Sequence, residues 1–499
     1  MSVYGESHYD YDLHDLVASS GNNDTILLNS SSYSGSDNRG IVIDKNLTIV
    51  GNNNTCISAD SAGRIFAVKT NCHLTLVNLS LADGSSDKGG LLFCDDNASL
   101  DIVNCSFKDS KASYGGAVYL NHDNVNIVNS SFTNNRIDAY YGGALFSSDT
   151  DLNIVNCSFE NNYGYFGGAL YNAPFGGKKT MITGSNFTNN IANANGGAVY
   201  TIGGAGFTIS ESSFKENKFI GSSLAVYGKG GGIYNKGTKD FNIVDTEFTG
   251  NSAVNGACVF NDDDGEVNII SSNLTENIAG GGAIYNNKGA TYITDISNIN
   301  DNVANSGYGG AIVNKDFIKI TISNIDNNKC NKDGGAIYST AGNLIIADCE
   351  LNNNTGDTTG GAISATNTNI HITTTDFKNN VAGTGGGIHA NNCQIVLDDS
   401  RRGGNLFENN RATFQDGGGM FLMGKTNGSI FNTTFKSNNC PGRGGGIFCG
   451  QDIKCINKTT NSTGIVLLLD KISYSGNGAG RGGANVYSSR TGDMGKIGE

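Results

Sequence analysis

The sequence predicts an all-β fold, a parallel β-helix solenoid of roughly 15–17 turns that begins with a short capping helix. Two short motifs and their spacing lead to this prediction. A Gly-Gly-Ala motif followed by an aliphatic residue alternates along the chain with a Phe-x-x-Asn motif, and each recurs about every 26 residues. Because repeats of fixed length stack on one another in solenoids, we expect each repeat to form one turn.

The Phe-x-x-Asn motif provides an anchor in each repeat, and Leu or Ile replaces Phe in the degenerate copies. We expect the anchors to stack in register along one edge. Asn tolerates the left-handed backbone conformation of a turn, and stacked Asn side chains can form amide ladders between turns. The residues with this expected structural role include Phe132, Asn135, Phe159, Asn162, Phe187 and Asn190.

The segments between the motifs have the pattern of short strands. Residues 125–132 read VNIVNSSF and residues 152–159 read LNIVNCSF, so apolar and polar residues alternate before each anchor. In the Gly-Gly-Ala motif, we expect the glycines to allow positive φ and close backbone approach at a corner. The Ala then faces a crowded interior, and the aliphatic and aromatic residues after it divide between core and surface.

The two ends of the chain differ from its body. We assign residues 1–33 to an N-terminal cap, residues 34–490 to a single parallel β-helix and residues 491–499 to a C-terminal tail. The last repeat is followed by no capping pattern, which predicts an open edge and is compatible with a chain that is part of a longer polypeptide.

The cap contains the one helical pattern that the sequence predicts. Leu13, Leu16 and Val17 form an apolar stripe with helical spacing, and Gly21 stops the helix. A helix followed by a strand would cover the first turn, which a solenoid requires.

Three cysteines occupy one position of the repeat. Cys105, Cys157 and Cys349 each stand two residues before an anchor, where other repeats carry Ser or Thr. A position shared by small side chains predicts buried, unpaired thiols. The expected disulfide group is Cys440, Cys449 and Cys455.

Composition excludes several classes of function. The chain has 33 basic and 46 acidic residues, a net charge of −13, which disfavours binding to nucleic acid and anionic membranes. No apolar run is long enough for a transmembrane helix. The first residues lack the pattern of a signal peptide. No Cys-x-x-Cys pair points to a structural zinc site, and no cofactor is expected.

The chain resembles three groups of known proteins. The order DTILLNSSSYSG, GIVIDKNLTIVG and SAGRIFAV is similar to the opening of pectin-lyase-like right-handed β-helix proteins. The alternating motifs resemble chlamydial polymorphic membrane protein repeats. The Asn-rich body, with NSSFTNN and GGAIYN, resembles adhesin-like surface proteins of methanogenic archaea. The resemblance covers roughly residues 13–490. It implies a right-handed parallel β-helix, an extracellular or cell-surface location, and a function in adhesion.

The strongest acidic cluster lies in one turn of the chain. Several carboxylates within five residues could hold Ca²⁺, which prefers oxygen ligands. The alternative is a solvated acidic turn between two strands, and we expect this simpler interpretation. The cluster consists of Asp262, Asp263, Asp264 and Glu266.

A second cluster lengthens a later repeat. Asp398 and Asp399 stand beside Arg401 and Arg402, a combination suited to acidic-sugar chemistry, although a surface loop has the same pattern. Asp95 and Asp96 beside Cys94 are a weaker candidate. His371 and His389 are less than one turn apart and need not be in register. No motif of a known catalytic site is present.

We therefore expect a non-enzymatic, surface-displayed adhesin or interaction scaffold that binds a glycan or protein on another cell surface. Insertions in solenoids map to loops on one face, so binding is expected in the long repeats at 218–230, 397–405 and 449–464. The candidate binding residues there are Tyr227, Arg401, Arg402 and Lys454. The alternative is a polysaccharide lyase or glycoside hydrolase, which would gather carboxylates and cations from adjacent turns into one groove.

Overall fold

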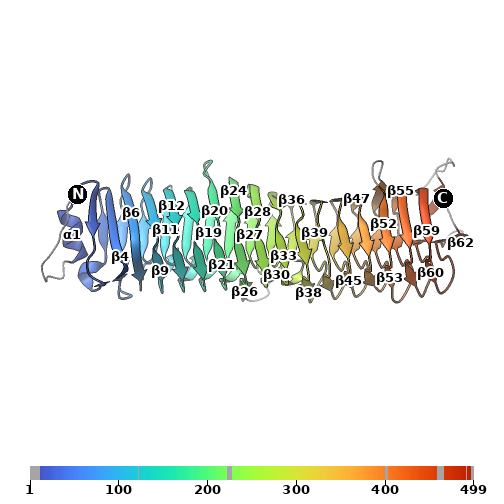
Figure 1. The fold of residues 1–499 in the computed structure, drawn as a ribbon, viewed down its shortest axis with the longest axis horizontal. Helices are drawn as coiled ribbons and strands as arrows, with labels where there is room; N and C mark the ends of the chain where they lie inside the picture. Colours follow the sequence, from blue (N-terminus) through green and yellow to red (C-terminus); the bar gives the residue numbers. More distant parts are fainter. Residues whose placement is uncertain are drawn as a thin grey trace. The chain divides into compact units, whose positions relative to one another are not determined.

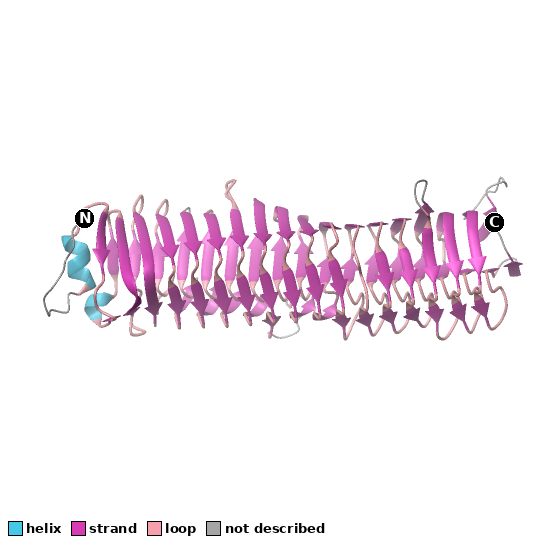
Figure 2. Ribbon diagram, in the orientation of Figure 1, coloured by secondary structure: helices cyan, strands magenta, loops and turns pink. Residues whose placement is uncertain are grey.

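The computed structural model describes residues 12–121, 123–221, 228–398, 403–457, 466–489 and 492–495. In these residues the chain is an all-β parallel solenoid of about 16 turns with one short N-terminal helix, which confirms the predicted fold class. The turns divide into two compact units, residues 1–253 and 254–499. Figures 1 and 2 show the strands of each unit lying side by side.

Helix α1 (Leu13–Ser19) begins the first unit. The carboxylate of Asp12 accepts a hydrogen bond from the N–H of Asp15 at 2.6 Å and thereby caps the helix. Leu13, Leu16 and Val17 are buried, as the apolar stripe predicts. The helix contacts η1 (Ser36–Asn38) and β3 (Ile41–Ile43), so it covers the first turns of the unit.

Each turn of the first unit places its strands on three faces. From β8 (Ser99–Val103) onward the anchor face carries two short strands, the middle face carries one, and the aromatic face carries the strand after the Gly-Gly-Ala motif, whereas in the two turns before it one long strand, β4 (Leu47–Ser58) or β6 (His73–Ala82), covers the anchor face. Each strand pairs in parallel with its equivalent in the next turn. Two consecutive turns are β16 (Asp151–Val155), β17 (Ser158–Glu160), β18 (Tyr163–Phe166) and β19 (Leu170–Ala173), then β20 (Thr180–Thr183), β21 (Asn186–Thr188), β22 (Ile191–Asn195) and β23 (Val199–Ile202).

The anchor aromatic rings stack in the core, which confirms their predicted role. Phe132 and Phe159 lie with their ring centroids 4.8 Å apart, and Phe159 and Phe187 lie 4.7 Å apart. The rings are parallel to within a few degrees, because the strands that carry them are exactly in register from one turn to the next.

The anchor amides form a buried ladder beside the rings. The Oδ1 of Asn162 accepts hydrogen bonds from the backbone N–H and from the Nδ2 of Asn135, each at 3.0 Å. The Nδ2 of Asn162 donates to Oδ1 of Asn190 at 3.0 Å and to the carbonyl of Phe132 at 2.9 Å. This fully buried side chain therefore has partners for its donors and its acceptor, as buried polar groups require.

The left-handed residue of the motif is not the anchor Asn. The residue before it adopts positive φ, 56° at Asn134, 54° at Asn161 and 53° at Asn189. The sequence-based assignment of this conformation to the anchor itself was therefore wrong. The exposed third position of the motif makes the turn, and the anchor Asn is required for the ladder.

The two positions of the motif require glycine for different structural reasons. Gly142 has a φ of 69°, which favours glycine. A Cβ on Gly143 would overlap the backbone carbonyl of Gly168 in the next turn. Ala144 follows and is fully buried. The predicted positive φ, close approach and small interior residue are thus confirmed.

The second unit repeats this plan, with Leu or Ile at its first four anchors and Phe at Phe377, Phe407 and Phe435. One of its turns consists of β43 (Asn343–Ala347), β44 (Glu350–Asn352), β45 (Thr355–Gly356) and β46 (Ile363–Thr366). Leu351 is fully buried at the anchor position. The amide ladder continues without interruption here, because the Nδ2 of Asn328 donates to Oδ1 of Asn354 at 3.1 Å and Asn354 donates likewise to Asn380.

The three predicted thiols are buried and unpaired, as expected. Burial raises the pKa of Cys105 and Cys157 to about 11 and that of Cys349 to about 12. Each Sγ donates to the carbonyl two residues earlier, as Ser130 Oγ does at 2.8 Å. Of the expected disulfide group, Cys449 pairs with Cys455, while Cys440 is free and buried.

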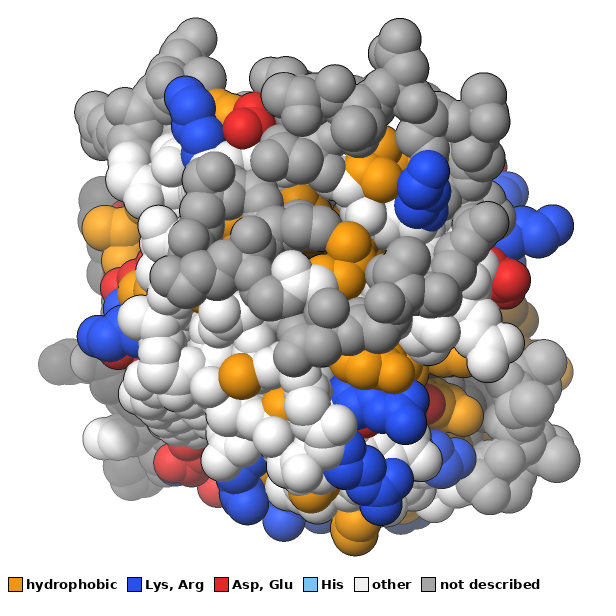
Figure 3. Space-filling model, turned by 90° about the vertical axis from the view of Figure 1, so that its right-hand side faces the viewer, with side chains coloured by type: hydrophobic (Ala, Val, Ile, Leu, Met, Phe, Trp, Pro, Cys, Tyr) orange, Lys and Arg blue, Asp and Glu red, His pale blue; other side chains and the backbone are white. Residues whose placement is uncertain are grey.

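The last turn of the second unit ends in a pairing that the sequence did not predict. Strand β62 (Gly492–Gly495) runs antiparallel to β61 (Val486–Ser488) and pairs with it. Figure 3 looks onto this end of the unit, where hydrophobic side chains lie beside several Lys and Arg side chains.

Candidate binding surface

Aromatic side chains lie in a stacked, buried or half-buried row on the outward side of the strands of the aromatic face. In the first unit, the residue after each buried aliphatic residue of the Gly-Gly-Ala motif is Tyr or Phe, and its ring points outward because side chains alternate along a strand. Adjacent rings stack 4.7–5.3 Å apart. We call this set the aromatic row, and in the first unit it includes Tyr119, Phe146, Tyr171, Tyr200 and Tyr234.

The second unit has its own aromatic row, and this row is interrupted. Phe260 in β31 (Val259–Asp262) stacks on Tyr285 in β35 (Ile284–Asn286), with ring centroids 4.8 Å apart. Tyr285 is in register with Val313 of the next turn, and Val313 is in register with Tyr338 of the turn after it. One ring is therefore missing between two tyrosines.

A groove with a volume of about 430 Å³ lies at Val313. We call it the tyrosine groove. Its walls combine aromatic rings, two lysines, small hydroxyl side chains and glycines. The residues that line it include Asn255, Gly281, Tyr285, Ser306, Tyr308, Val313, Lys315, Lys332, Tyr338 and Thr340.

Tyr308 enters the groove from a loop. It lies between β38 (Val303–Ala304) and β39 (Ile312–Asn314), directly before the glycines of its motif. Its ring stacks on Tyr338 with centroids 4.4 Å apart and an interplanar angle of 22°. The Tyr308 ring thus lies against the wall of the groove and narrows the gap that Val313 leaves.

Two ammonium groups lie over the rings. Lys315 Nζ is 5.2 Å from the centroid of Tyr285, and Lys332 Nζ is 4.9 Å from that of Tyr308. Both lysines are exposed, and neither forms an ion pair with a carboxylate among the described residues. Burial, together with Tyr308 and Asp333, raises the pKa of Tyr338, so its phenol stays protonated and can donate a hydrogen bond.

The acidic turn at residues 262–266 uses its carboxylates in separate contacts. Asp262 Oδ1 accepts a hydrogen bond from Asn287 Nδ2 at 2.8 Å, and Asp264 pairs with Lys288 Nζ at 3.0 Å. Asp263 and Asp264 adopt left-handed φ values of 56° and 61°. In the described part of the chain, no three His, Cys, Asp or Glu side chains are grouped so that they could hold a metal ion.

The second predicted cluster is only partly described. Asp398, at the end of β51 (Gln394–Asp398), lies 3.0 Å from Nε2 of His371. Lys454 begins β58 (Lys454–Asn457) and is exposed, and it does not line the tyrosine groove. The other candidates, Asp399, Arg401, Arg402 and Tyr227, lie outside the described residues.

The two later histidines lie on different faces. His371 is in β47 (Asn369–Thr373) on the anchor face, whereas His389 is in β50 (Ile388–Asn391) on the aromatic face. His389 stacks on Phe421 at 5.3 Å, and burial lowers its pKa to about 4. The structure therefore does not bring them into one site.

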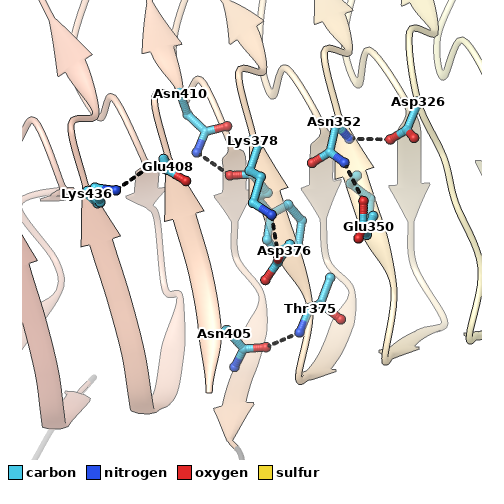
Figure 4. Close-up of polar contacts among 12 residues, drawn as sticks. Asp326, Glu350, Asn352, Thr375, Asp376, Lys378, Asn405, Glu408, Asn410 and Lys436 are labelled. Atoms are coloured by element: carbon cyan, nitrogen blue, oxygen red, sulfur yellow. Dashed lines mark hydrogen bonds and ion pairs between the residues drawn. The ribbon is translucent and has the colours of Figure 1, made fainter. Parts of the chain in front are cut away.

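A row of carboxylates on the anchor face of the second unit was not predicted from the sequence. It consists of Asp326, Glu350, Asp376 and Glu408 (Figure 4). Burial and the nearby carboxylates of Glu350 and Asp301 raise the pKa of Asp326 to about 6, although the N–H of Asn352 donates to it at 2.7 Å. In the following turns, Lys378 pairs with Asp376 at 2.6 Å and Lys436 pairs with Glu408 at 2.7 Å. These residues flank the anchors, so aligning the repeats would have revealed the row.

One buried carboxyl lies near the weakest predicted cluster. Asp123 is buried, and its Oδ2 accepts the N–H of Asn121 at 2.7 Å, while its Oδ1 has no partner among the described residues. Burial and the neighbouring carboxylates of Asp96 and Asp95 raise the pKa of Asp123 to about 8.

One repeat matches a known family. Residues 322–340 match the Chlamydia polymorphic membrane protein repeat, which indicates a family of outer-membrane or surface proteins. This segment contains Lys332 and Tyr338 of the tyrosine groove. No curated protein sequence matches the chain. In the described residues, no helix is long and apolar enough to cross a membrane.

Two solved structures share distant similarity with the chain. The Dettilon tailspike protein has 12% sequence identity and a TM-score of 0.26, over 85% of this chain and 62% of the tailspike chain. This chain therefore spans less than two thirds of the tailspike. The A-module of the Azotobacter vinelandii mannuronan C-5 epimerase AlgE6 has 11% identity and a TM-score of 0.18, over 86% of this chain and 90% of the module.

Proposed function

We propose that this protein is a non-enzymatic, surface-displayed β-helical adhesin or interaction scaffold that binds a glycan or protein on another cell. The observation that supports this most directly is the aromatic row. The rings of the row lie on the outward side of their strands and cover one another by stacking, so each is buried or half-buried. Aromatic residues are enriched at binding interfaces, and a row of stacked rings along one face is a surface of that kind. The inward residues of the same strands, such as Leu145 and Val199, fill the core between the faces, so the row forms a second, outer layer of packing.

Surface display is supported by the polymorphic membrane protein repeat at residues 322–340. The similarity of the Asn-rich repeats to adhesin-like surface proteins of methanogenic archaea supports the same location. We propose that binding uses the aromatic face as well as the long loops in which Tyr227, Arg401, Arg402 and Lys454 were predicted to act.

The adhesin proposal is tested by attaching the purified chain to beads and measuring their retention on cells and on immobilised glycans and proteins. We expect retention that soluble chain competes away. Beads that adhere no better than beads carrying an unrelated protein would contradict a role in adhesion.

The alternative function is a polysaccharide lyase or glycoside hydrolase. The specific observation in its favour is Asp326, whose raised pKa suits a general acid and which lies near Glu350 of the next turn. We expect no turnover of pectate, alginate or other acidic glycans. Measurable turnover that is lost in Asp326→Asn, with binding retained, would replace the adhesin proposal by the enzyme.

A further inference from the structure

We propose that the tyrosine groove binds an acidic oligosaccharide, a short stretch of a polysaccharide whose sugars carry carboxylate or sulfate groups. This inference rests on the proposed adhesin function and names the ligand class for one site. It depends on three features of the groove: the missing ring at Val313, the aromatic walls, and the two lysines.

The groove is built by a single substitution in an otherwise regular turn. Ile312 and Ile337 keep the core filled on the inward side of the same strands. On the outward side, Val313 stands in register between Tyr285 and Tyr338. Val313 lines the groove and is itself only 2% exposed, and the backbone pairing continues through all three turns, so the groove has a rigid, buried floor. A preformed site of this kind loses little entropy on binding.

The walls suit the two surfaces of a sugar ring. A pyranose has an apolar face of C–H groups and a polar rim of hydroxyls, so it stacks on a flat aromatic ring and forms hydrogen bonds at its edge. Tyr285 forms one wall, and the Tyr308–Tyr338 pair forms the other. The phenol of Tyr338 can donate a hydrogen bond, and the hydroxyls of Ser306 and Thr340 also line the groove.

Two lysines line the groove of an acidic chain, with the carboxylate of Asp333 close enough to help raise the pKa of Tyr338. The protein carries a net charge of −13, yet Lys315 and Lys332 both lie at the tyrosine groove. Each ammonium is held over a ring rather than neutralised by a described carboxylate. A cation held in this way is available to an anion that enters the groove. An acidic sugar can stack on the tyrosine rings and also form ion pairs with the two lysines, whereas a neutral sugar can only stack on the rings.

Titration calorimetry with defined oligosaccharides tests the proposal on the full chain. The probes are an oligogalacturonate, a heparin-derived oligosaccharide and a neutral cello-oligosaccharide of equal length. We expect one or both acidic probes to bind at least tenfold more tightly than the neutral one, with affinity that falls as salt rises. The two acidic probes distinguish carboxylated from sulfated ligands.

Three variants locate the binding. Val313→Tyr introduces at this position the ring that the neighbouring turns carry and should fill the groove from its floor. Lys315→Ala combined with Lys332→Ala removes the charges. Lys319→Ala is the control, because Lys319 is exposed on the anchor face of the same turn. We expect Val313→Tyr to abolish binding, the double variant to weaken it at least tenfold, and the control to leave it unchanged.

Three results would overturn the inference. They are equal affinity for the neutral probe, unchanged affinity in Val313→Tyr, and binding of a protein ligand but of no acidic oligosaccharide. If Val313→Tyr beads still adhere to cells like the native chain, the groove assignment fails while the adhesin function stands. If native beads adhere to nothing, both proposals fail together.

Discussion

Replacing one rung of the amide ladder tests how much the ladder contributes to stability. In Asn162→Leu, the new side chain has a similar volume, so no large cavity forms. Three groups then lose the hydrogen-bond partner that Asn162 provides. They are the backbone N–H of Asn135, one Nδ2 hydrogen of Asn135 and the backbone carbonyl of Phe132. Each buried polar group without a partner costs about 1–3 kcal/mol, so for three groups we expect the free energy of unfolding to fall by about 3–9 kcal/mol.

Urea unfolding followed by circular dichroism measures this loss. Because turns of a solenoid can open separately, hydrogen exchange of the Asn135 amide should be measured as well. Asn126→Leu is the matched control, since Asn126 is exposed and its Nδ2 makes one hydrogen bond at the surface, to Asp101 at 2.9 Å. We expect the control to change stability by less than about 0.5 kcal/mol.

A small effect of Asn162→Leu would refute the reasoning. If its unfolding free energy stayed within about 0.5 kcal/mol of the native value, the buried amides would be replaceable by apolar packing. Stacking of Phe132, Phe159 and Phe187 would then suffice to hold the turns in register.

Three further predictions concern single residues. Cys157, whose pKa burial raises to about 11, should resist thiol reagents at pH 8 in native protein and react after unfolding, as read by mass spectrometry. Gly143→Ala should cost about 2 kcal/mol or more, because its Cβ would meet the next turn, whereas Gly63→Ala should be near neutral in urea unfolding. Burial raises the pKa of Asp123 in the folded state to about 8, so the folded protein holds a proton that the unfolded chain has already released. The free energy of unfolding should therefore fall as the pH rises from about 4 to 8. This decrease with pH should be absent in Asp123→Asn.

The repeat positions could be predicted because each one meets the same environment in every turn. Phe132, Phe159 and Phe187 recur at a fixed spacing since each ring must lie on the one before it. Gly143 recurs because the next turn leaves no room for a Cβ. Periodicity in the sequence is thus a direct record of contacts between neighbouring turns.

Details that depend on the register of neighbouring turns were harder to predict. The motif does not reveal which of its two last residues is left-handed, since Asn occupies both positions in the turn at Asn134 and Asn135. The carboxylate of Asp326 is 24 residues from Glu350, so their proximity follows only from the stacking of turns. Linear clusters such as residues 262–266 looked more promising because they are contiguous, yet their carboxylates have separate partners.

The tyrosine groove lies at a departure from the repeat that no insertion in the sequence marks. Insertions attract attention because they break the period, but an outward residue can change without altering it. Val313 replaces an aromatic ring in a turn whose neighbours, Tyr285 and Tyr338, remain in register with it. The inward residues of these strands fill the core, and Val313, at the outward position, lines the floor of the groove. A binding site can therefore arise by removal of one ring, and departures from the consensus at outward positions are where such sites should be sought.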